Sequence, residues 1–536
     1  MKLKDAQAKA YEMAVLRGVC CYIAGAGGTG KTFTVKLIIE RLFRMRLGVL
    51  VSAFTGTAAK RASVSEERLR GHTLHSLFKF KMMKRDFDKT PHYIDDRFTG
   101  KEEEEEEGFE EEEVGSAGNG RYLTARITQT TYSLLSKLHV LVIDEISMLQ
   151  PDAMEVIERV LRFVKGRPRK LFGGVQVICV GDFAQLPPIK PRRDRRDKAE
   201  FVFEMALWTR FMQPIVLSEV VRQKDREDVA LLSKMRDGRM TYDDCETLVK
   251  MSYRRNGSGS TKPMLTLCAK RDKCNIINSN EFRLLGGPAN LYKPDCTLVT
   301  VNTEPRRTHL HVEHAQARMP YHQFEFPTCD FVELKVGTRV QCVRNIYQRS
   351  DDGSVACAAS GARGRGRGGE EEEIPEGVEI DAARLREDSI YNVPTPQRVL
   401  SNGMLGTVTI LHSETVCVEW DDLPGMPMPM PRSWKRKTQG FQCDSYEGGP
   451  YGVVCKASYL AIAQASAVTF HKAQGMTAHG RLDVDIESWH GCYGGGYTAV
   501  SRATELANVR FINSTPQPGH FQCHPKVKAY HRKLFG

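Results

Sequence analysis

One glycine-rich stretch has the composition of a loop that holds a phosphate group. Residues 25–32 read Gly-Ala-Gly-Gly-Thr-Gly-Lys-Thr, after an apolar run at 19–24 and before a helical pattern at 33–42. Glycines let backbone N–H groups turn inward on an anion, and the start of the helix adds its positive dipole end. Lys31 is expected to reach the β- and γ-phosphates, and the Thr32 hydroxyl to bind Mg²⁺. A plain turn between strand and helix is the alternative. The spacing favours a nucleotide site made of Gly25, Ala26, Gly27, Gly28, Thr29, Gly30, Lys31 and Thr32.

Two adjacent carboxylates follow another apolar run. Residues 138–143 end at Asp144 and Glu145. Beside a phosphate-binding loop, one carboxylate can hold Mg²⁺ together with Thr32, and the other can polarise a water for in-line attack on the γ-phosphate. We assign Asp144 to the metal and Glu145 to the base. The alternative is a pair of solvated acids at the end of a strand.

Three more side chains suit the γ-phosphate. Gln185 lies just past an apolar strand at 175–180, so its amide is expected to contact the γ-phosphate and the attacking water. An arginine from a second domain can neutralise charge on a transferring phosphoryl group. Arg502 and Arg222 are the candidates, and taken alone each would be interpreted as a surface arginine.

The elements that must position these groups alternate between strand and helix. Apolar runs at 47–53, 138–143 and 175–180 join the run before the glycine-rich loop, and helical patterns separate them. This pattern predicts a parallel, doubly wound sheet that binds its ligand at the carboxyl ends of the strands. A second unit of this kind begins near 264–268 and returns at 461–477. The short strands between its two parts predict a small β-barrel.

Composition limits the class of protein. The chain has 536 residues, 41% of them hydrophobic and 27% charged, which favours a soluble protein of several domains without a membrane span. Its 15 cysteines include no Cys-x-x-Cys pair, so we expect reduced thiols and no zinc knuckle. The net charge of +11 includes ten glutamates within residues 102–113, so the remaining chain is strongly basic and a nucleic-acid partner is expected.

The order of these motifs resembles that of superfamily 1 helicases of the 5′-to-3′ class, specifically the Pif family related to the exonuclease V α-subunit. The similar segments are 25–32 for motif I, 53–59 for Ia, 143–148 for II, 181–188 for III, 222–223 for IV, 468–477 for V and 497–503 for VI. The strings His-Lys-Ala-Gln-Gly-Met-Thr in motif V and Gly-Asp-Phe-Ala-Gln-Leu-Pro-Pro in motif III are the most specific. The resemblance runs from Gln7 to about Phe511.

The resemblance implies an ATP-dependent DNA helicase that translocates 5′ to 3′ on single-stranded DNA and unwinds duplexes and G-quadruplexes. It implies roles in DNA replication, repair, recombination and telomere maintenance, with ATP and Mg²⁺ as cofactors. Single-stranded DNA and single-strand/duplex junctions are the expected partners of a monomer without membrane association. The N-terminal residues show no targeting signal, and a processed chain would look the same. We therefore expect the nucleus, with the mitochondrion as the alternative.

The resemblance also assigns residues. Gln7 is expected to bind adenine, and Arg222 and Arg502 the γ-phosphate. The residues expected on the DNA strand are Thr55, Gly56, His75, Thr469, His471 and Lys472. Two other readings stay open. One is an RNA-directed helicase of the same superfamily, and the other is a nucleic-acid-binding scaffold that has lost turnover.

The implied fold is α/β, with two RecA-like domains, a wedge insertion and an SH3-like β-barrel insertion. The predicted boundaries are 1–212 for the first RecA-like domain, 79–122 for its wedge, 101–114 for a disordered acidic loop, 213–345 and 461–536 for the second RecA-like domain, 346–460 for the barrel and 350–375 for a disordered insert. ATP is expected to be the only link that holds the two RecA-like domains together.

Overall fold

The structure is a computed structural model. It describes residues 4–53, 71–84, 93–95, 121–188, 199–221, 225–256, 265–301, 331–347, 398–441, 451–478, 480–487, 489 and 492–535. Within these ranges, no helix combines the length and the apolar character needed to cross a membrane.

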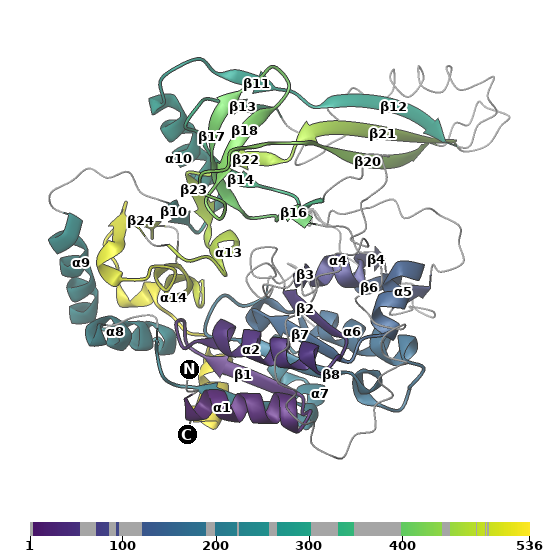
Figure 1. Cartoon of the computed structure of the whole chain (residues 1–536). Helices are drawn as coiled ribbons and strands as arrows, with labels where there is room; N and C mark the ends of the chain where they lie inside the picture. The colour runs from purple at the N-terminus through teal and green to yellow at the C-terminus, as the bar shows by residue number, and fades with distance from the viewer. Residues whose placement is uncertain are drawn as a thin grey trace, which may run out of the picture.

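A parallel sheet organises the first half of the chain (Figure 1). In sheet order its strands are β3 (Gly71–Thr73), β2 (Val49–Ala53), β7 (Val140–Asp144), β8 (Gln176–Gly181), β1 (Cys21–Gly25) and β9 (Gln213–Leu217). The register aligns the carboxyl ends of the central strands, since Ala53 pairs with Asp144 and Ala24 with Gly181. The predicted doubly wound sheet is therefore confirmed, and its ligand edge carries the glycine-rich loop and both carboxylates.

Helices cover both faces of this sheet, and together they form the first lobe. The helices are α1 (Asp5–Tyr11), α2 (Lys31–Arg44), α4 (Leu74–Phe78), α5 (Gln129–Ser136), α6 (Pro151–Val164) and α7 (Ala206–Phe211). Successive strand residues point to opposite faces. Val140 and Val142 pack in one core with Ile38 of α2, and Leu141 packs in the other core with Ile157 of α6. The helical pattern expected between the apolar runs at 138–143 and 175–180 is thus confirmed as α6.

A second parallel sheet lies in the C-terminal half and forms the second lobe with its helices. Its strands are β23 (Ala467–Thr469), β10 (Leu265–Cys268), β24 (Leu482–Asp485) and β25 (Val509–Ile512). Its helices are α8 (Arg226–Asp237), α9 (Tyr242–Asn256), α10 (Arg271–Leu284), α13 (Phe470–Ala473) and α14 (Gly495–Val500). The two short helices α13 and α14 lie on the side that faces the first lobe (Figure 1).

An antiparallel region lies beyond the second lobe and has a core of its own around Trp420, Val340 and Val418. One sheet contains β19 (Met428–Pro429), β18 (Val416–Trp420), β17 (Leu405–Leu411), β14 (Arg339–Cys342) and β22 (Ile462–Gln464). Another contains β12 (Asp295–Val301), β21 (Tyr451–Leu460) and β20 (Arg432–Phe441). The strand pairs β11 (Asn290–Tyr292) with β13 (Val332–Leu334), and β15 (Ile346–Tyr347) with β16 (Arg398–Leu400), complete the described part.

The insertion after β3 contains a small sheet. Strand β6 (Arg121–Ile127) lies between β4 (Phe80–Lys84) and β5 (Tyr93–Asp95). Since β6 runs to Ile127, this sheet extends past the boundary predicted at residue 122. The acidic loop at 101–114 and the insert at 350–375 lie outside the described residues.

Two other predicted boundaries are wrong. Strand β9 pairs with β1, so the first sheet extends to Leu217 and does not end at residue 212. Strand β14 pairs with β17 and β22, so the antiparallel region includes residues before 346 and after 460. Both errors arise because a strand belongs to the sheet with which it pairs, and the position of the nearest motif does not fix that boundary.

The C-terminal helix was also assigned to the wrong lobe. Helix α15 (Pro525–Phe535) contacts β9 of the first lobe. Its Tyr530 stacks on Phe203 with ring centroids 4.3 Å apart and accepts a hydrogen bond of 3.0 Å from the Trp208 indole. The chain therefore leaves the first lobe after β9, forms the second lobe, and returns.

Candidate active site between the two lobes

The glycine-rich loop joins β1 to α2 in the predicted manner. Gly28 and Gly30 have φ of 87° and 81°, a region that residues with a Cβ seldom adopt. A Cβ on Gly25 would lie 2.5 Å from Thr29 Oγ1 and 2.9 Å from the Leu217 carbonyl oxygen. The loop thus needs glycine both for its conformation and for its close packing.

Lys31 begins helix α2 and turns back over the loop. Its ammonium donates to the carbonyl oxygens of Gly25 and Ala26, at 2.8 and 2.9 Å. Burial lowers the pKa of Lys31, while the nearby carboxylates of Asp182, Glu145 and Asp144 act in the opposite direction. A phosphate offers this cation a charged acceptor and hence a stronger hydrogen bond than a carbonyl does.

Gln7 lies against the same loop. Its side chain is buried in α1, and its Oε1 accepts the Lys4 N–H at 3.3 Å. A Cβ on Gly30 would lie 2.9 Å from Gln7 Nε2. The helix at the N-terminus therefore brings an amide side chain directly to the glycine loop.

The two carboxylates stand at the end of β7, as predicted. Glu145 has φ of 53°, which is uncommon for a residue other than glycine, and its N–H donates to Asp144 Oδ1 at 2.8 Å. Gln474 of the second lobe donates through Nε2 to Glu145 Oε2 at 3.2 Å and to Ser147 Oγ at 3.1 Å. Gln474 directly follows α13, so the candidate base is tied to the motif V segment.

Arg502 and Gln185 meet at the interface between the lobes. Their side chains are 4% and 5% exposed, and Arg502 Nη2 lies 3.5 Å from Gln185 Oε1. Arg502 also donates to the Thr498 carbonyl oxygen at 2.9 Å and to Ser501 Oγ at 3.0 Å. Arg222, the other arginine candidate, lies outside the described residues.

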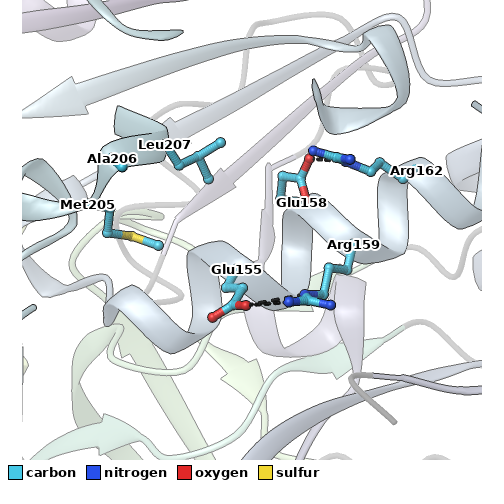
Figure 2. Close-up of a pocket in the computed structure, with 7 residues that line it drawn as sticks. All are labelled: Glu155, Glu158, Arg159, Arg162, Met205, Ala206 and Leu207. Atoms are coloured by element: carbon cyan, nitrogen blue, oxygen red, sulfur yellow. Dashed lines mark hydrogen bonds and ion pairs between the residues drawn. The ribbon is translucent and has the colours of Figure 1, made fainter. Parts of the chain in front are cut away.

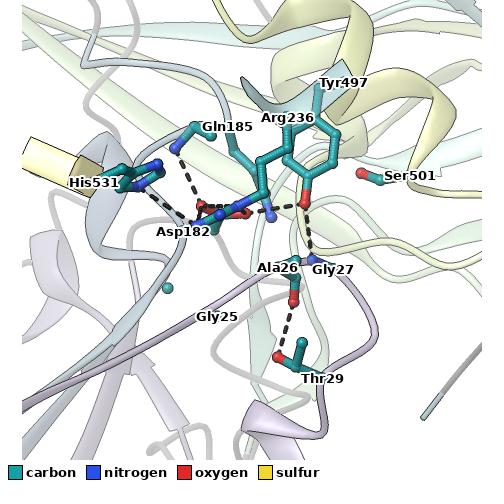
Figure 3. Close-up of polar contacts among 12 residues, drawn as sticks. Gly25, Ala26, Gly27, Thr29, Asp182, Gln185, Arg236, Tyr497, Ser501 and His531 are labelled. Atoms are coloured by element: carbon teal, nitrogen blue, oxygen red, sulfur yellow. Dashed lines mark hydrogen bonds and ion pairs between the residues drawn. The ribbon is translucent and has the colours of Figure 1, made fainter. Parts of the chain in front are cut away.

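A buried ion pair that sequence reasoning missed lies beside the loop (Figure 3). Asp182 is fully buried and accepts Arg236 Nε and Nη2 at 3.0 to 3.1 Å. Burial alone would raise the pKa of Asp182, but the Arg236 guanidinium lowers it from the ordinary 3.8 to about 2. Burial and Arg236 lower the pKa of His531 to about 4, and this imidazole from α15 lies 3.5 Å from Arg236. Asp182 lies within motif III and could have been suspected, whereas Arg236 belongs to no motif.

Tyr497 connects this ion pair to the glycine-rich loop. Its hydroxyl donates to Asp182 Oδ2 at 3.0 Å and accepts the Gly27 N–H at 2.9 Å (Figure 3). Together with the contacts of Gln474 and Arg502, this bond joins the lobes through protein groups alone. The expectation that ATP is their only link is therefore wrong.

The residues predicted to bind nucleic acid are divided between the lobes. His75 lies on α4 of the first lobe, edge-on to Phe80 with ring centroids 5.5 Å apart, and burial lowers its pKa to about 4. Thr469, His471 and Lys472 lie together at the junction of β23 and α13 in the second lobe. Thr55 and Gly56 lie outside the described residues.

A pocket on the outer side of α6 shares no residue with this site (Figure 2). It has a volume of about 430 Å³, and helix α6 lines one side of it, facing Met205 and Leu207. Its charged groups pair with one another, as Arg159 does with Glu155 at 2.7 Å. This pocket offers no arrangement comparable to the interface between the lobes.

Comparisons with known proteins agree on one family. A family model described as PIF1-like helicase matches residues 2–98 and 119–244. Two proteins named ATP-dependent DNA helicase PIF1 match 97% of this chain, one from Danio rerio at 25% identity and one from Emericella nidulans at 26%. The chain spans about three fifths of their lengths, 62% and 61%.

Solved structures agree on the fold. Bacteroides Pif1 bound to single-stranded DNA has a TM-score of 0.65 at 22% identity, with 99% of this chain and 97% of that chain covered. Bacteroides Pif1 in complex with ADP-AlF3 and single-stranded DNA has the same TM-score and identity, with 100% and 98% covered. The likeness supports the α/β architecture with two RecA-like lobes.

Proposed function

We propose that this chain is a member of the PIF1-like helicase family and that it is an ATP-dependent DNA helicase that moves 5′ to 3′ on single-stranded DNA. The observation that carries the proposal is the contact of Arg502 with Gln185. It supports an assignment in which a second-lobe arginine acts at the sheet edge that also carries Lys31 and Glu145. A γ-phosphate sensor, a cation and a base therefore meet from both lobes, which is what phosphoryl transfer needs.

Each residue of the site has a role in this proposal. Lys31 binds the β- and γ-phosphates, Gln7 binds adenine, and Glu145 orients the attacking water. Arg502 exchanges its carbonyl and hydroxyl acceptors for the phosphoryl oxygens. Hydrolysis removes that acceptor, so the lobes separate and close once in each cycle.

Magnesium fits the groups present. Thr32 is the second residue of α2 and Asp144 ends β7 at the same sheet edge, and both offer the oxygen ligands that Mg²⁺ prefers. When bound there, the ion neutralises negative charge that develops between the β- and γ-phosphates.

DNA is proposed to run across both lobes. His75 stands on the first lobe, and Thr469, His471 and Lys472 stand on the second. Gln474 follows these second-lobe residues and contacts Glu145. One segment of the chain would therefore contact both the DNA and the candidate base. Single-stranded DNA should therefore stimulate the ATPase.

A phosphate-release assay tests the proposal. We expect turnover that is strongly stimulated by single-stranded DNA and absent in Lys31→Ala, which loses the phosphate-binding cation. Lys250→Ala serves as the control, since Lys250 forms an exposed ion pair on α9. Duplexes with a 5′ overhang should unwind and those with a 3′ overhang should not. No turnover with either DNA or RNA would leave the scaffold alternative, and stimulation by RNA alone would favour an RNA-directed helicase.

The finer expectations are also proposed. They are G-quadruplex unwinding, roles in replication, repair, recombination and telomere maintenance, a nuclear location and a monomeric state. Unwinding of a quadruplex substrate tests the first of these, microscopy of the tagged chain tests the location, and mass measurement in solution tests the monomeric state. The mitochondrion is the competing location.

A further inference from the structure

The Tyr497 hydroxyl occupies a donor of the phosphate-binding loop. Tyr497 is 2% exposed, and its oxygen accepts the Gly27 N–H at 2.9 Å. Gly27 lies between the end of β1 and the start of α2, in the segment whose N–H groups cradle phosphates. A phosphate oxygen and this phenol oxygen are acceptors of the same kind for the same N–H.

Close packing leaves little room for both acceptors. A Cβ on Gly27 would lie 3.6 Å from the Tyr497 hydroxyl and 3.5 Å from Ser501 Cβ. Helix α14 and the residue that follows it therefore both lie against the loop. A triphosphate that takes the Gly27 N–H must move the Tyr497 hydroxyl away.

The second hydrogen bond of Tyr497 does not compete with a nucleotide. The hydroxyl donates to Asp182 Oδ2, and Arg236 holds Asp182 in place through a bidentate contact. When the Gly27 bond breaks, the bond to Asp182 can persist. Helix α14 then turns about this anchor and stays at the interface.

We propose that Tyr497 is a positioning residue of the nucleotide site, whose hydroxyl takes the place of a phosphate oxygen on Gly27 and yields it when a nucleotide binds. The proposal rests on the proposed function. Its consequence concerns Arg502, which follows in the same segment and bonds to Thr498 and Ser501. Release of α14 from the loop lets the arginine turn from these acceptors to the γ-phosphate.

Tyr497→Phe is the direct test, because it keeps the ring and removes only the oxygen. Without its competitor, ADP should bind about threefold to tenfold more tightly, as expected for one hydrogen bond. AMP has no β-phosphate for the loop, so its affinity should not change. The KM for ATP should fall without a rise in kcat.

Tyr493→Phe is the matched control, since Tyr493 packs edge-on against His524 in the segment just before α14. Its affinity for ADP should equal that of the unchanged protein. If the unchanged protein binds and hydrolyses nucleotide, equal or weaker ADP binding by Tyr497→Phe overturns the proposal. Failure of the proposed function is separate, because the unchanged protein would then show no ATPase.

Hydrogen exchange of the unchanged protein gives a second measurement if Tyr497→Phe does not fold. ADP should slow exchange in residues 25–32 and speed it in residues 495–501. Slower exchange in both segments would overturn the proposal, because α14 would then be held more firmly by the nucleotide.

Discussion

The two surfaces that meet at the active site are built in different ways. The first lobe presents strand ends, at Gly25, Asp144 and Gly181, whose positions follow from the register of a parallel sheet. The second lobe presents side chains from α13 and α14, which are only four and six residues long. Such short helices depend on packing for their stability.

This difference separates a fixed half of the site from an adjustable half. The first-lobe groups keep their geometry as long as the sheet is folded. The second-lobe groups Gln474, Tyr497 and Arg502 each form a hydrogen bond with a first-lobe partner, and these bonds depend on how the two lobes are positioned. Variants on the two surfaces should therefore fail in distinguishable ways.

Removing the second-lobe cation should have the largest effect. Arg502→Ala deletes the group proposed to neutralise the γ-phosphate, so DNA-stimulated kcat should fall by about a thousandfold or more. ADP affinity should be nearly unchanged, since ADP has no γ-phosphate. The exposed Arg510→Ala in β25 is the control. A normal kcat in Arg502→Ala would remove the arginine from the mechanism.

Removing the base on the fixed half should have the next largest effect. Glu145→Gln keeps the shape of the side chain but loses its basicity, so kcat should fall by about a hundredfold to ten-thousandfold with ATP still bound. Phosphate release measures the fall in kcat, and a nucleotide-binding assay measures whether ATP still binds. Glu155→Gln on the exposed side of α6 should behave like the unchanged protein. Undiminished hydrolysis in Glu145→Gln would refute the assignment.

The buried ion pair predicts an acid dependence of stability. The pKa of Asp182 is about 2 in the folded protein and 3.8 ordinarily, so its contribution is complete above pH 3.8 and is lost as the pH falls through about 2. The difference corresponds to about 2 kcal/mol of unfolding free energy. Urea titrations between pH 5 and pH 2 measure it. Asp182→Asn should lack this part of the slope, and an identical slope would contradict the inferred pairing.

The smallest effect is expected from the link between α13 and the base. Gln474→Leu removes the amide that donates to Glu145, so stimulation by single-stranded DNA should fall by about threefold to tenfold, the range for one hydrogen bond. The KM for ATP should not change, since Gln474 contacts no residue of the phosphate loop in the described hydrogen bonds. Gln464→Leu in β22 is the control. A changed KM for ATP with normal stimulation by single-stranded DNA would mean that Gln474 acts in nucleotide binding by the first-lobe half of the site.

The sequence predicted the fixed half well, because its chemistry is local. A strand, glycine loop and helix are adjacent in the chain, and Asp144 and Glu145 directly follow an apolar run. Each of these features needs only a few consecutive residues and the rules of sheet geometry.

The adjustable half was predicted only as a set of residue types. Nothing in the spacing pairs Arg236 with Asp182 or Tyr497 with Gly27, because those contacts form only after two lobes have folded and docked. The edge strand β3 has only three residues, too few for a periodic pattern. In the edge strand β9, Pro214 argues against a strand interior although it is tolerated at a sheet edge. The return of α15 to the first lobe has no local signal at all.

That return has a mechanical consequence. The backbone crosses between the lobes twice, once from β9 to α8 and once from β25 to α15. Two bodies joined at two points can swing about the line through those points but resist twisting and sliding. We therefore expect a hinge motion about a single axis, so that every cycle of ATP hydrolysis would produce the same displacement in the same direction.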